Sequence, residues 1–111
     1  MTAKLVDKIE RIEGVIGSAI VSKDGTIIES SDISESDASL IAFAGRTAEE
    51  ITGMFVLGEP KITLIQGSNY RLMVSKYNDG HIGAFIKPDA NIKSVKSEID
   101  SVVFEVFLWE Y

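Results

Sequence analysis

Residues 13–28 read EGVIGSAIVSKDGTII, two runs rich in β-branched residues that are separated by a short polar turn. Val and Ile favour extended backbone because their branched side chains pack well on a pleated sheet. Asp24-Gly25 between two such runs is the strongest short-range signal for a hairpin. We therefore predict antiparallel strands over residues 15–22 and 26–30, joined by a tight turn at this dipeptide.

Gly14 and Gly17 stand between this hairpin and the residues before it. Residues 2–13 carry Leu5 and Ile9 at helical spacing, which predicts a helix that ends near Gly14. A glycine loop that binds phosphate needs the opposite order, because the free N–H groups of a following helix must face the anion. We therefore predict a corner between a helix and a strand here, not a nucleotide site.

The rest of the chain alternates helical and extended segments. Ser34 or Ser36 can cap a long helix over residues 37–55. Three strands and a last helix follow, at residues 59–66, 69–77, 81–87 and from Ile92 onward. The order α-β-β-α-β-β-β-α with short hairpin connections predicts one α+β domain over residues 1–111. In it, a five-stranded antiparallel sheet carries helices on both faces.

The composition excludes several classes of function. The chain has 17 acidic and 11 basic residues and a net charge of −6, whereas a nucleic-acid binder needs a concentrated basic face. It has no cysteine, so neither a disulfide nor a zinc–thiolate site can form. No apolar run reaches the roughly 20 residues that span a bilayer, and the N-terminus lacks the apolar run of a secretory signal. We expect a cytoplasmic domain without direct membrane insertion.

The residues that carry chemistry in enzymes do not form a recognisable group in this sequence. His81 is the single histidine, and its place beside the turn at residues 78–80 predicts an exposed side chain. Glu49 and Glu50 are adjacent in a helix, so their side chains diverge by about 100° and cannot share a proton. We therefore expect no catalytic, cofactor or metal site.

The long helix carries more apolar surface than one sheet contact requires. Its first stripe, which we expect on the sheet, consists of Ile41, Ala44, Ala48, Ile51 and Phe55. Its second stripe consists of Leu40, Phe43, Thr47 and Met54, with Glu50 at its border. Two interpretations remain open at this point: a deep groove of the same subunit buries the second stripe, or another chain does. Ala42 and Gly45 belong to the thin remaining face.

Pro60 in the predicted strand over residues 59–66 cannot donate a ladder hydrogen bond, so it fits only an edge strand or the start of a strand. An edge strand can pair with the same strand of a second molecule. The dimer interface predicted from the helix and this strand consists of Leu40, Phe43, Thr47, Glu50, Met54, Ile62 and Leu64.

The C-terminal residues are also more apolar than one helix face can bury. Either they close over the core or they form part of a partner surface. The side chains concerned are Phe104, Phe107, Leu108 and Trp109.

Taken together, these segments resemble the roadblock / dynein light-chain domains, which have a profilin/longin-like α+β sandwich. The resemblance covers nearly the whole chain. It is carried by the order and spacing of IEGVIGSAIV at 12–21, KDGTIIE at 23–29, Gln66-Gly67 before YRLMV at 70–74, and Ala90-Asn91 before the last helix.

The resemblance implies a non-enzymatic adaptor or regulator. Members of that family form dimers through the long helix and the third strand, and they bind small Ras-like GTPases. The expected partners are therefore a second copy or a roadblock paralogue, and such a GTPase. Arg11, Arg46 and Arg71 are the only candidates for an arginine finger, and none lies on a predicted projecting loop. We therefore expect a scaffold, or a hydrolysis modulator that works without a finger.

Two alternatives remain open. A small-molecule sensor of the PAS-like or profilin-like type also places helices on a five-stranded antiparallel sheet, and it would need a lined internal pocket. A structural subunit of a motility or membrane-tethering complex would need no nucleotide-linked partner.

Overall fold

The structure of the chain, a computed structural model, describes residues 5–55, 57–58 and 61–110, with side chains described as far as Phe104. The elements are α1 (Leu5–Glu10), β1 (Val15–Val21), β2 (Ile27–Ser31), α2 (Glu35–Met54), β3 (Ile62–Gln66), β4 (Arg71–Tyr77), β5 (Gly80–Ile86) and α3 (Ile92–Glu110). This order confirms the prediction from the sequence. The expected start of the first helix at residues 2–4, and residues 59–60 with Pro60, lie outside the described residues.

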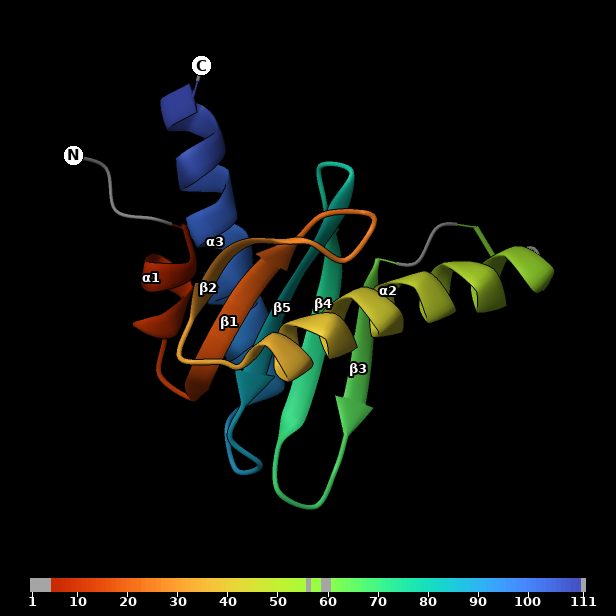
Figure 1. Cartoon of the computed structure of the whole chain (residues 1–111). Helices are drawn as coiled ribbons and strands as arrows, with labels where there is room; N and C mark the ends of the chain where they lie inside the picture. Colours follow the sequence, from red (N-terminus) through yellow and green to blue (C-terminus); the bar gives the residue numbers. More distant parts are fainter. Residues whose placement is uncertain (1–4, 56, 59–60, 111) are drawn as a thin grey trace.

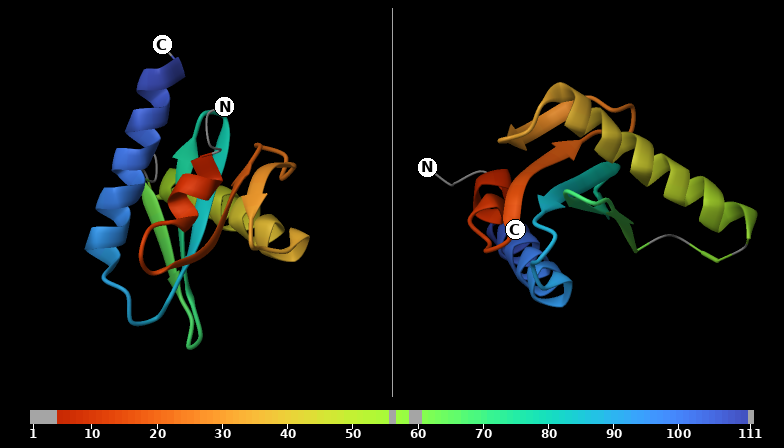
Figure 2. Two further views of the ribbon diagram at one scale, coloured as in Figure 1. Left: turned by 90° about the vertical axis from the view of Figure 1, so that its left-hand side faces the viewer. Right: turned by 90° about the horizontal axis from the view of Figure 1, so that it is seen from below.

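The five strands form one antiparallel sheet in the order β2-β1-β5-β4-β3. Hairpins join β1 to β2, β3 to β4, and β4 to β5, while the central pair β1 and β5 brings together distant parts of the chain. α2 covers one face of the sheet, and α1 and α3 lie side by side on the other (Figure 2). The predicted α+β fold with helices on both faces is confirmed.

The alternation of side chains along the strands supplies a separate core to each face. On β1, Ala19 and Val21 belong to the core under α2, whereas Ile20 belongs to the core under α1 and α3. On β4, Leu72 and Met73 divide in the same way. Because the side-chain period of a strand is two, one sheet can bury both faces and still hold a single register.

Gly14 forms the predicted corner, whereas Gly17 already lies within β1 and is paired with Phe85 of β5. Gly14 has φ +98° and lies between α1 and β1, and its carbonyl accepts a 2.8 Å hydrogen bond from the Lys87 N–H. A Cβ at Gly14 would lie 2.7 Å from the Ala90 Cβ, so both the backbone angle and the close approach require glycine. The element that follows Gly14 is the strand β1, so this glycine does not open a helix as a phosphate-binding loop requires.

The hairpin turn between β1 and β2 is held by its own polar groups. Gly25 adopts φ +91°, and the Ser22 N–H donates to the Thr26 carbonyl at 2.8 Å. The Asp24 carboxylate accepts hydrogen bonds from the Ser22 hydroxyl and then from Thr26, which hold the pKa of Asp24 below its ordinary value.

α2 begins two residues earlier than predicted, at Glu35. The Ser34 hydroxyl accepts from the Asp37 N–H at 3.2 Å, and the Asp37 carboxylate accepts from the Ser34 N–H at 3.5 Å. This reciprocal capping box satisfies two backbone donors that the first turn of a helix leaves free. From this cap α2 crosses the sheet and continues past β3, so its C-terminal end projects beyond the edge (Figure 1).

Candidate functional site

The first half of α2 is the part that packs on the sheet. Its buried residues are Ala38, Ile41, Ala42, Ala44 and Gly45. Gly83 on β5 permits this close packing, because a Cβ there would lie 2.5 Å from the Ile41 Cγ1. The predicted place of Ala42 and Gly45 on the thin outer face is therefore wrong: small side chains mark the side on which the helix approaches the sheet most closely.

The second half of α2 has little sheet beneath it. Ile51 is 48% exposed and Phe55, which follows the helix, is 67% exposed. The prediction that the whole first stripe packs on the sheet is thus correct for Ile41 and Ala44 and wrong for these two residues. Helical periodicity gives the direction of a side chain around the axis, but it does not show where the helix leaves the sheet.

The second stripe faces solvent in the monomer. Leu40, Phe43 and Met54 are exposed, Thr47 is partly buried, and Glu50 is exposed. A deep groove of the same subunit does not cover this stripe, so that interpretation is wrong. We use the name α2 apolar surface for the exposed apolar residues that run along this side of the helix to its end: Leu40, Phe43, Ile51, Met54 and Phe55.

β3 forms one edge of the described sheet, where it pairs with β4, and this agrees with one of the two places that Pro60 allowed. Ile65 pairs with Leu72 and shares its side with α2, whereas Leu64 pairs with Met73 on the opposite side. Leu64 and Ile65 are both 43% exposed. Ile62 is partly buried and packs on the core under α1 and α3.

Two of the predicted interface residues, Ile62 and Leu64, therefore lie across the sheet from the α2 apolar surface. Ile62 and Leu64 on one face, and the α2 apolar surface on the other, can be joined only around the free edge of β3. Ile65 lies on the same side as α2 and was missed, although the strict alternation of side chains along a strand was the signal that could have found it.

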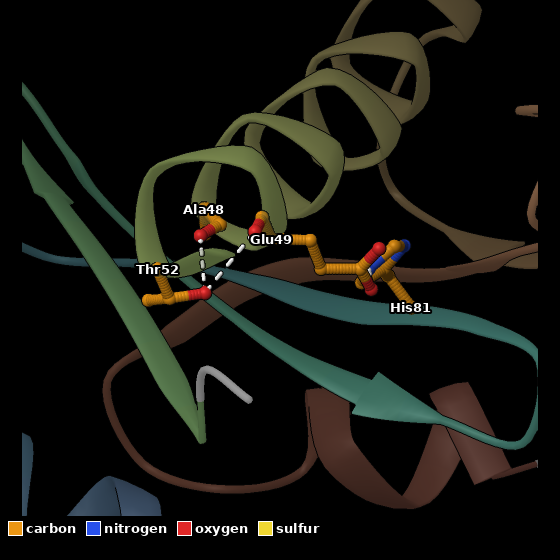
Figure 3. A network of polar contacts seen from close by, with 4 residues as sticks. All are labelled: Ala48, Glu49, Thr52 and His81. Carbon is orange, nitrogen blue, oxygen red and sulfur yellow. Dashed lines mark hydrogen bonds and ion pairs between the residues drawn. The ribbon is translucent and has the colours of Figure 1, made fainter. Parts of the chain in front are cut away.

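His81 is buried, contrary to the prediction of an exposed turn. Its side chain is 6% exposed, and its Nε2 lies 3.2 Å from the Glu49 Oε1. Figure 3 shows the Glu49 side chain extending from α2 to the His81 ring. The strand already begins at Gly80, and His81 points under α2, where a Cβ on Gly45 would lie 2.3 Å from its Cδ2.

The contact between His81 and Glu49 holds α2 against the sheet near the point where the helix passes the sheet edge. One turn further on, the Thr52 hydroxyl donates to the Ala48 carbonyl at 2.9 Å (Figure 3). The His81 Nδ1 has no hydrogen-bond partner in the described part of the chain. The contact between the buried His81 ring and the Glu49 carboxylate thus joins β5 to α2.

The three candidate arginines, Arg11, Arg46 and Arg71, have different surroundings. Arg71 donates to the Lys87 carbonyl at 2.9 Å and to the Ala90 carbonyl, so its guanidinium is fixed to the loop before α3. Arg46 is exposed on α2, and Arg11 is exposed after α1. None of the three lies on a projecting loop within the residues that the structure describes.

The main hollows among the described residues are surface grooves. A polar groove of about 1210 Å³ lies between α2 and the β1–β2 and β4–β5 turns, and it includes His81, Arg46 and Glu49. A second groove of about 660 Å³ lies between α3 and the β3–β4 hairpin. In the same part of the chain, no group of three His, Cys, Asp or Glu side chains could hold a metal ion, and no helix is long and apolar enough to cross a bilayer.

α3 leaves part of its apolar surface open. Phe104 is 60% exposed, so this residue does not close over the core. The side chains of the other three predicted partner residues, Phe107, Leu108 and Trp109, lie outside the described residues.

Comparison with known sequences decides the family. The family model of the Roadblock/LC7 domain matches residues 1–84, from the N-terminus into β5. The chain belongs to this family. No curated protein sequence matches it.

Solved structures agree with the roadblock assignment. A roadblock domain from Streptomyces avermitilis superposes with a TM-score of 0.83 at 14% identity, over 95% of this chain and 93% of that one. Myxococcus xanthus MglB gives 0.81 at 17% identity, over 96% and 92%. The gliding protein MglB from Thermus thermophilus gives 0.74 at 12% identity, over 88% and 79%. At these identities the likeness concerns the fold.

Proposed function

We propose that this roadblock domain is a non-enzymatic dimeric adaptor that binds a small Ras-like GTPase. The observation that carries the proposal is the α2 apolar surface, which the monomer leaves in water. Full burial of a Leu, Phe or Met side chain is worth about 1.5–3 kcal/mol, so a partner that covers Leu40, Phe43 and Met54 would gain considerable free energy.

A two-fold symmetric pair is the simplest arrangement that covers the α2 apolar surface and also pairs the free edge of β3. In such a pair the same patch on each copy contacts its equivalent, so α2 packs against α2 of the second copy. The free backbone groups of β3 then meet those of the second β3 and continue the sheet. Leu64 and Ile65 flank this edge on its two sides, which brings both groups of predicted interface residues into one contact. A roadblock paralogue with a similar α2 would fit the same surface.

The GTPase part of the proposal rests on family membership, since Ras-like GTPases are the partners expected of roadblock domains. The fixed guanidinium of Arg71 and the helical position of Arg46 favour docking, or reorientation of the GTPase's own residues, over insertion of an arginine finger. The proposal includes a cytoplasmic location, where Ras-like GTPases draw on the pool of GTP.

Affinity capture tests this function. The immobilised domain is incubated with native lysate of the source organism in GDP and, separately, in a non-hydrolysable GTP analogue, and retained proteins are identified by mass spectrometry. We expect a Ras-like GTPase retained in one nucleotide state and reduced on a Met54→Asp column. A Lys93→Glu column is the control, because Lys93 is exposed on α3, on the face of the sheet opposite α2. Retention of motility or membrane proteins with no GTPase among them would contradict the GTPase assignment and favour a structural subunit.

A further inference from the structure

β2 forms the edge of the sheet opposite β3. Among the described residues it pairs with β1 alone, so its outer side has no strand beside it. Figure 2 shows β2 and β3 at opposite sides of the sheet. An edge strand presents unpaired N–H and C=O groups to which a further extended segment can bond. A dimer that uses β3 would leave this second edge open on each copy.

The two faces of β2 differ in charge. Glu29 pairs with Ile20, whose side chain belongs to the core under α1 and α3, so Glu29 lies on the α1 side of the sheet. Two residues further on, the Ser31 hydroxyl donates to the Glu10 carboxylate of α1. Ile27 lies on the other side, where it packs on the core under α2. The α1 side of this edge therefore carries two carboxylates, whereas the α2 side is uncharged.

The chain that builds this edge is acidic. Residues 24–45 contain no Lys, Arg or His, and their acidic residues are Asp24, Glu29, Asp32, Glu35 and Asp37. Within the described residues, no ion pair neutralises Glu29, Asp32 or Glu35. The basic residues of the neighbouring α1 segment, Lys8 and Arg11, are not paired with them. These carboxylates therefore favour a basic partner.

The Glu29 carboxylate lacks a hydrogen-bond donor at one of its oxygens. Its Oε1 is buried and accepts no hydrogen bond from the part of the chain that the structure describes. A carboxylate oxygen that is removed from water without a donor raises the free energy of the folded chain. A Lys or Arg side chain of a partner would supply that donor in a charge-assisted hydrogen bond.

The regular part of this edge is short. The pairing of β2 with β1 shifts between Glu29 and Ile27, which leaves Ile28 without a partner residue, and its side chain is 60% exposed. Such a bulge disrupts the ladder locally, so residues 29–31 are the part that continues a regular sheet. A segment of a few residues can cover this edge, and its charges should contribute much of its specificity.

We propose that the β2 edge binds an extended basic segment of another protein. The backbone of that segment continues the sheet beyond β2, and its Lys or Arg side chains lie on the α1 side, next to Glu29 and Glu10. Because side chains alternate along a strand, these basic residues stand at every second position. A second copy of this chain is a poor occupant, because two β2 strands would bring their carboxylates together.

Nuclear magnetic resonance of the full, isotope-labelled chain with designed peptides tests this proposal. The probe is an end-capped hexapeptide of alternating Lys and Val. Its counterparts are a peptide with Glu in place of every Lys, and a peptide of the same composition with all Lys before all Val. We expect the alternating basic peptide to bind, with its largest amide shifts at residues 28–31, and both counterparts to bind far more weakly.

Variants of the edge separate its charge from the rest of the molecule. Glu29→Gln should lower the affinity for the alternating basic peptide by about twofold to tenfold, because it removes one partly exposed ion pair. Glu29→Lys should lower it further. Glu98→Gln and Glu98→Lys make the same charge changes at an exposed position on α3 and should retain the wild-type preference. Circular dichroism shows whether each variant is folded.

Several outcomes would overturn the assignment of the β2 edge. Equal binding of the alternating and the reordered basic peptide would show attraction by charge without strand pairing. Amide shifts centred outside β2, equal losses in the Glu29 and Glu98 variants, or no binding at about 1 mM peptide would also contradict it. Phe43→Asp, which should abolish self-association, should leave peptide binding unchanged, so this proposal and the dimer can fail separately.

Discussion

The two halves of α2 have the same local structure and opposite surroundings. In the first half, Ile41 is fully buried and Gly45 packs on the ring of His81. In the second half, Ile51 is 48% exposed, and a Cβ on Gly53 would have no neighbour within 4 Å. The first half of the helix therefore builds the monomer with its inner side, whereas the α2 apolar surface begins on its outer side at Leu40 and Phe43 and takes in Ile51 on the inner side of the second half. The difference teaches that an apolar helix residue belongs to the core only where the sheet extends beneath it.

The largest expected contrast is between the two isoleucines. Ile41→Ala should lower the free energy of unfolding by about 2–5 kcal/mol, because it leaves a cavity in a closely packed core. Ile51→Ala should change it by less than about 1 kcal/mol, because the side chain is half in water and Ala is the better helix former. Urea unfolding at a protein concentration too low for self-association measures both. Equal losses of unfolding free energy in Ile41→Ala and Ile51→Ala would show that the two halves of α2 do not differ in their packing on the sheet.

The two glycines should respond with opposite signs. Gly45→Ala should destabilise the fold by about 1–3 kcal/mol, because the new methyl group overlaps the His81 ring. Gly53→Ala should stabilise the monomer by about 0.5–1 kcal/mol, since it enters open space and restricts the unfolded chain. Thermal unfolding of both variants gives the signs directly. A stabilised Gly45→Ala would show that the His81 ring moves aside and that the first half is less tightly packed than described.

The smallest contrast is between two adjacent glutamates. Glu49→Ala removes the contact with His81 and should cost about 0.5–1.5 kcal/mol, as for one partly exposed hydrogen bond. Glu50→Ala should stay within about 0.5 kcal/mol, because Glu50 is exposed. Both are measured by urea unfolding at pH 7. If Glu50→Ala cost more than Glu49→Ala, the boundary between the two halves would have to be moved.

Local signals in the sequence predict the fold well. The Asp24-Gly25 turn, the Ser34 cap and the corner at Gly14 are each decided within a few residues, and the structure contains all three. Pro60 restricted its strand to an edge position or placed itself at a strand start, and β3 lies at an edge of the described sheet. These features need no knowledge of the rest of the molecule, because short-range sterics and hydrogen bonds specify them.

The errors concern relations between distant segments. His81 was expected in water, but its strand begins one residue earlier, and Gly45, 36 positions before it, opens the space that it fills. Ile51 and Phe55 were expected on the sheet because their helical spacing is correct, but the sheet ends beneath α2 before they are reached. The groove beside α3 was missed because Lys61 and Lys96 are brought together only by the tertiary fold.

Sedimentation equilibrium tests the central claim, that the α2 apolar surface is where two copies meet. The wild-type chain, Phe43→Asp and the control Lys93→Glu, which changes an exposed residue of α3 across the sheet from α2, are compared from low to high micromolar concentration. We predict the mass of two chains for the wild type and the control, and the mass of one chain for Phe43→Asp with its far-ultraviolet circular dichroism unchanged. A wild-type protein that stays monomeric throughout, or a Phe43→Asp variant that remains a dimer, would contradict the account.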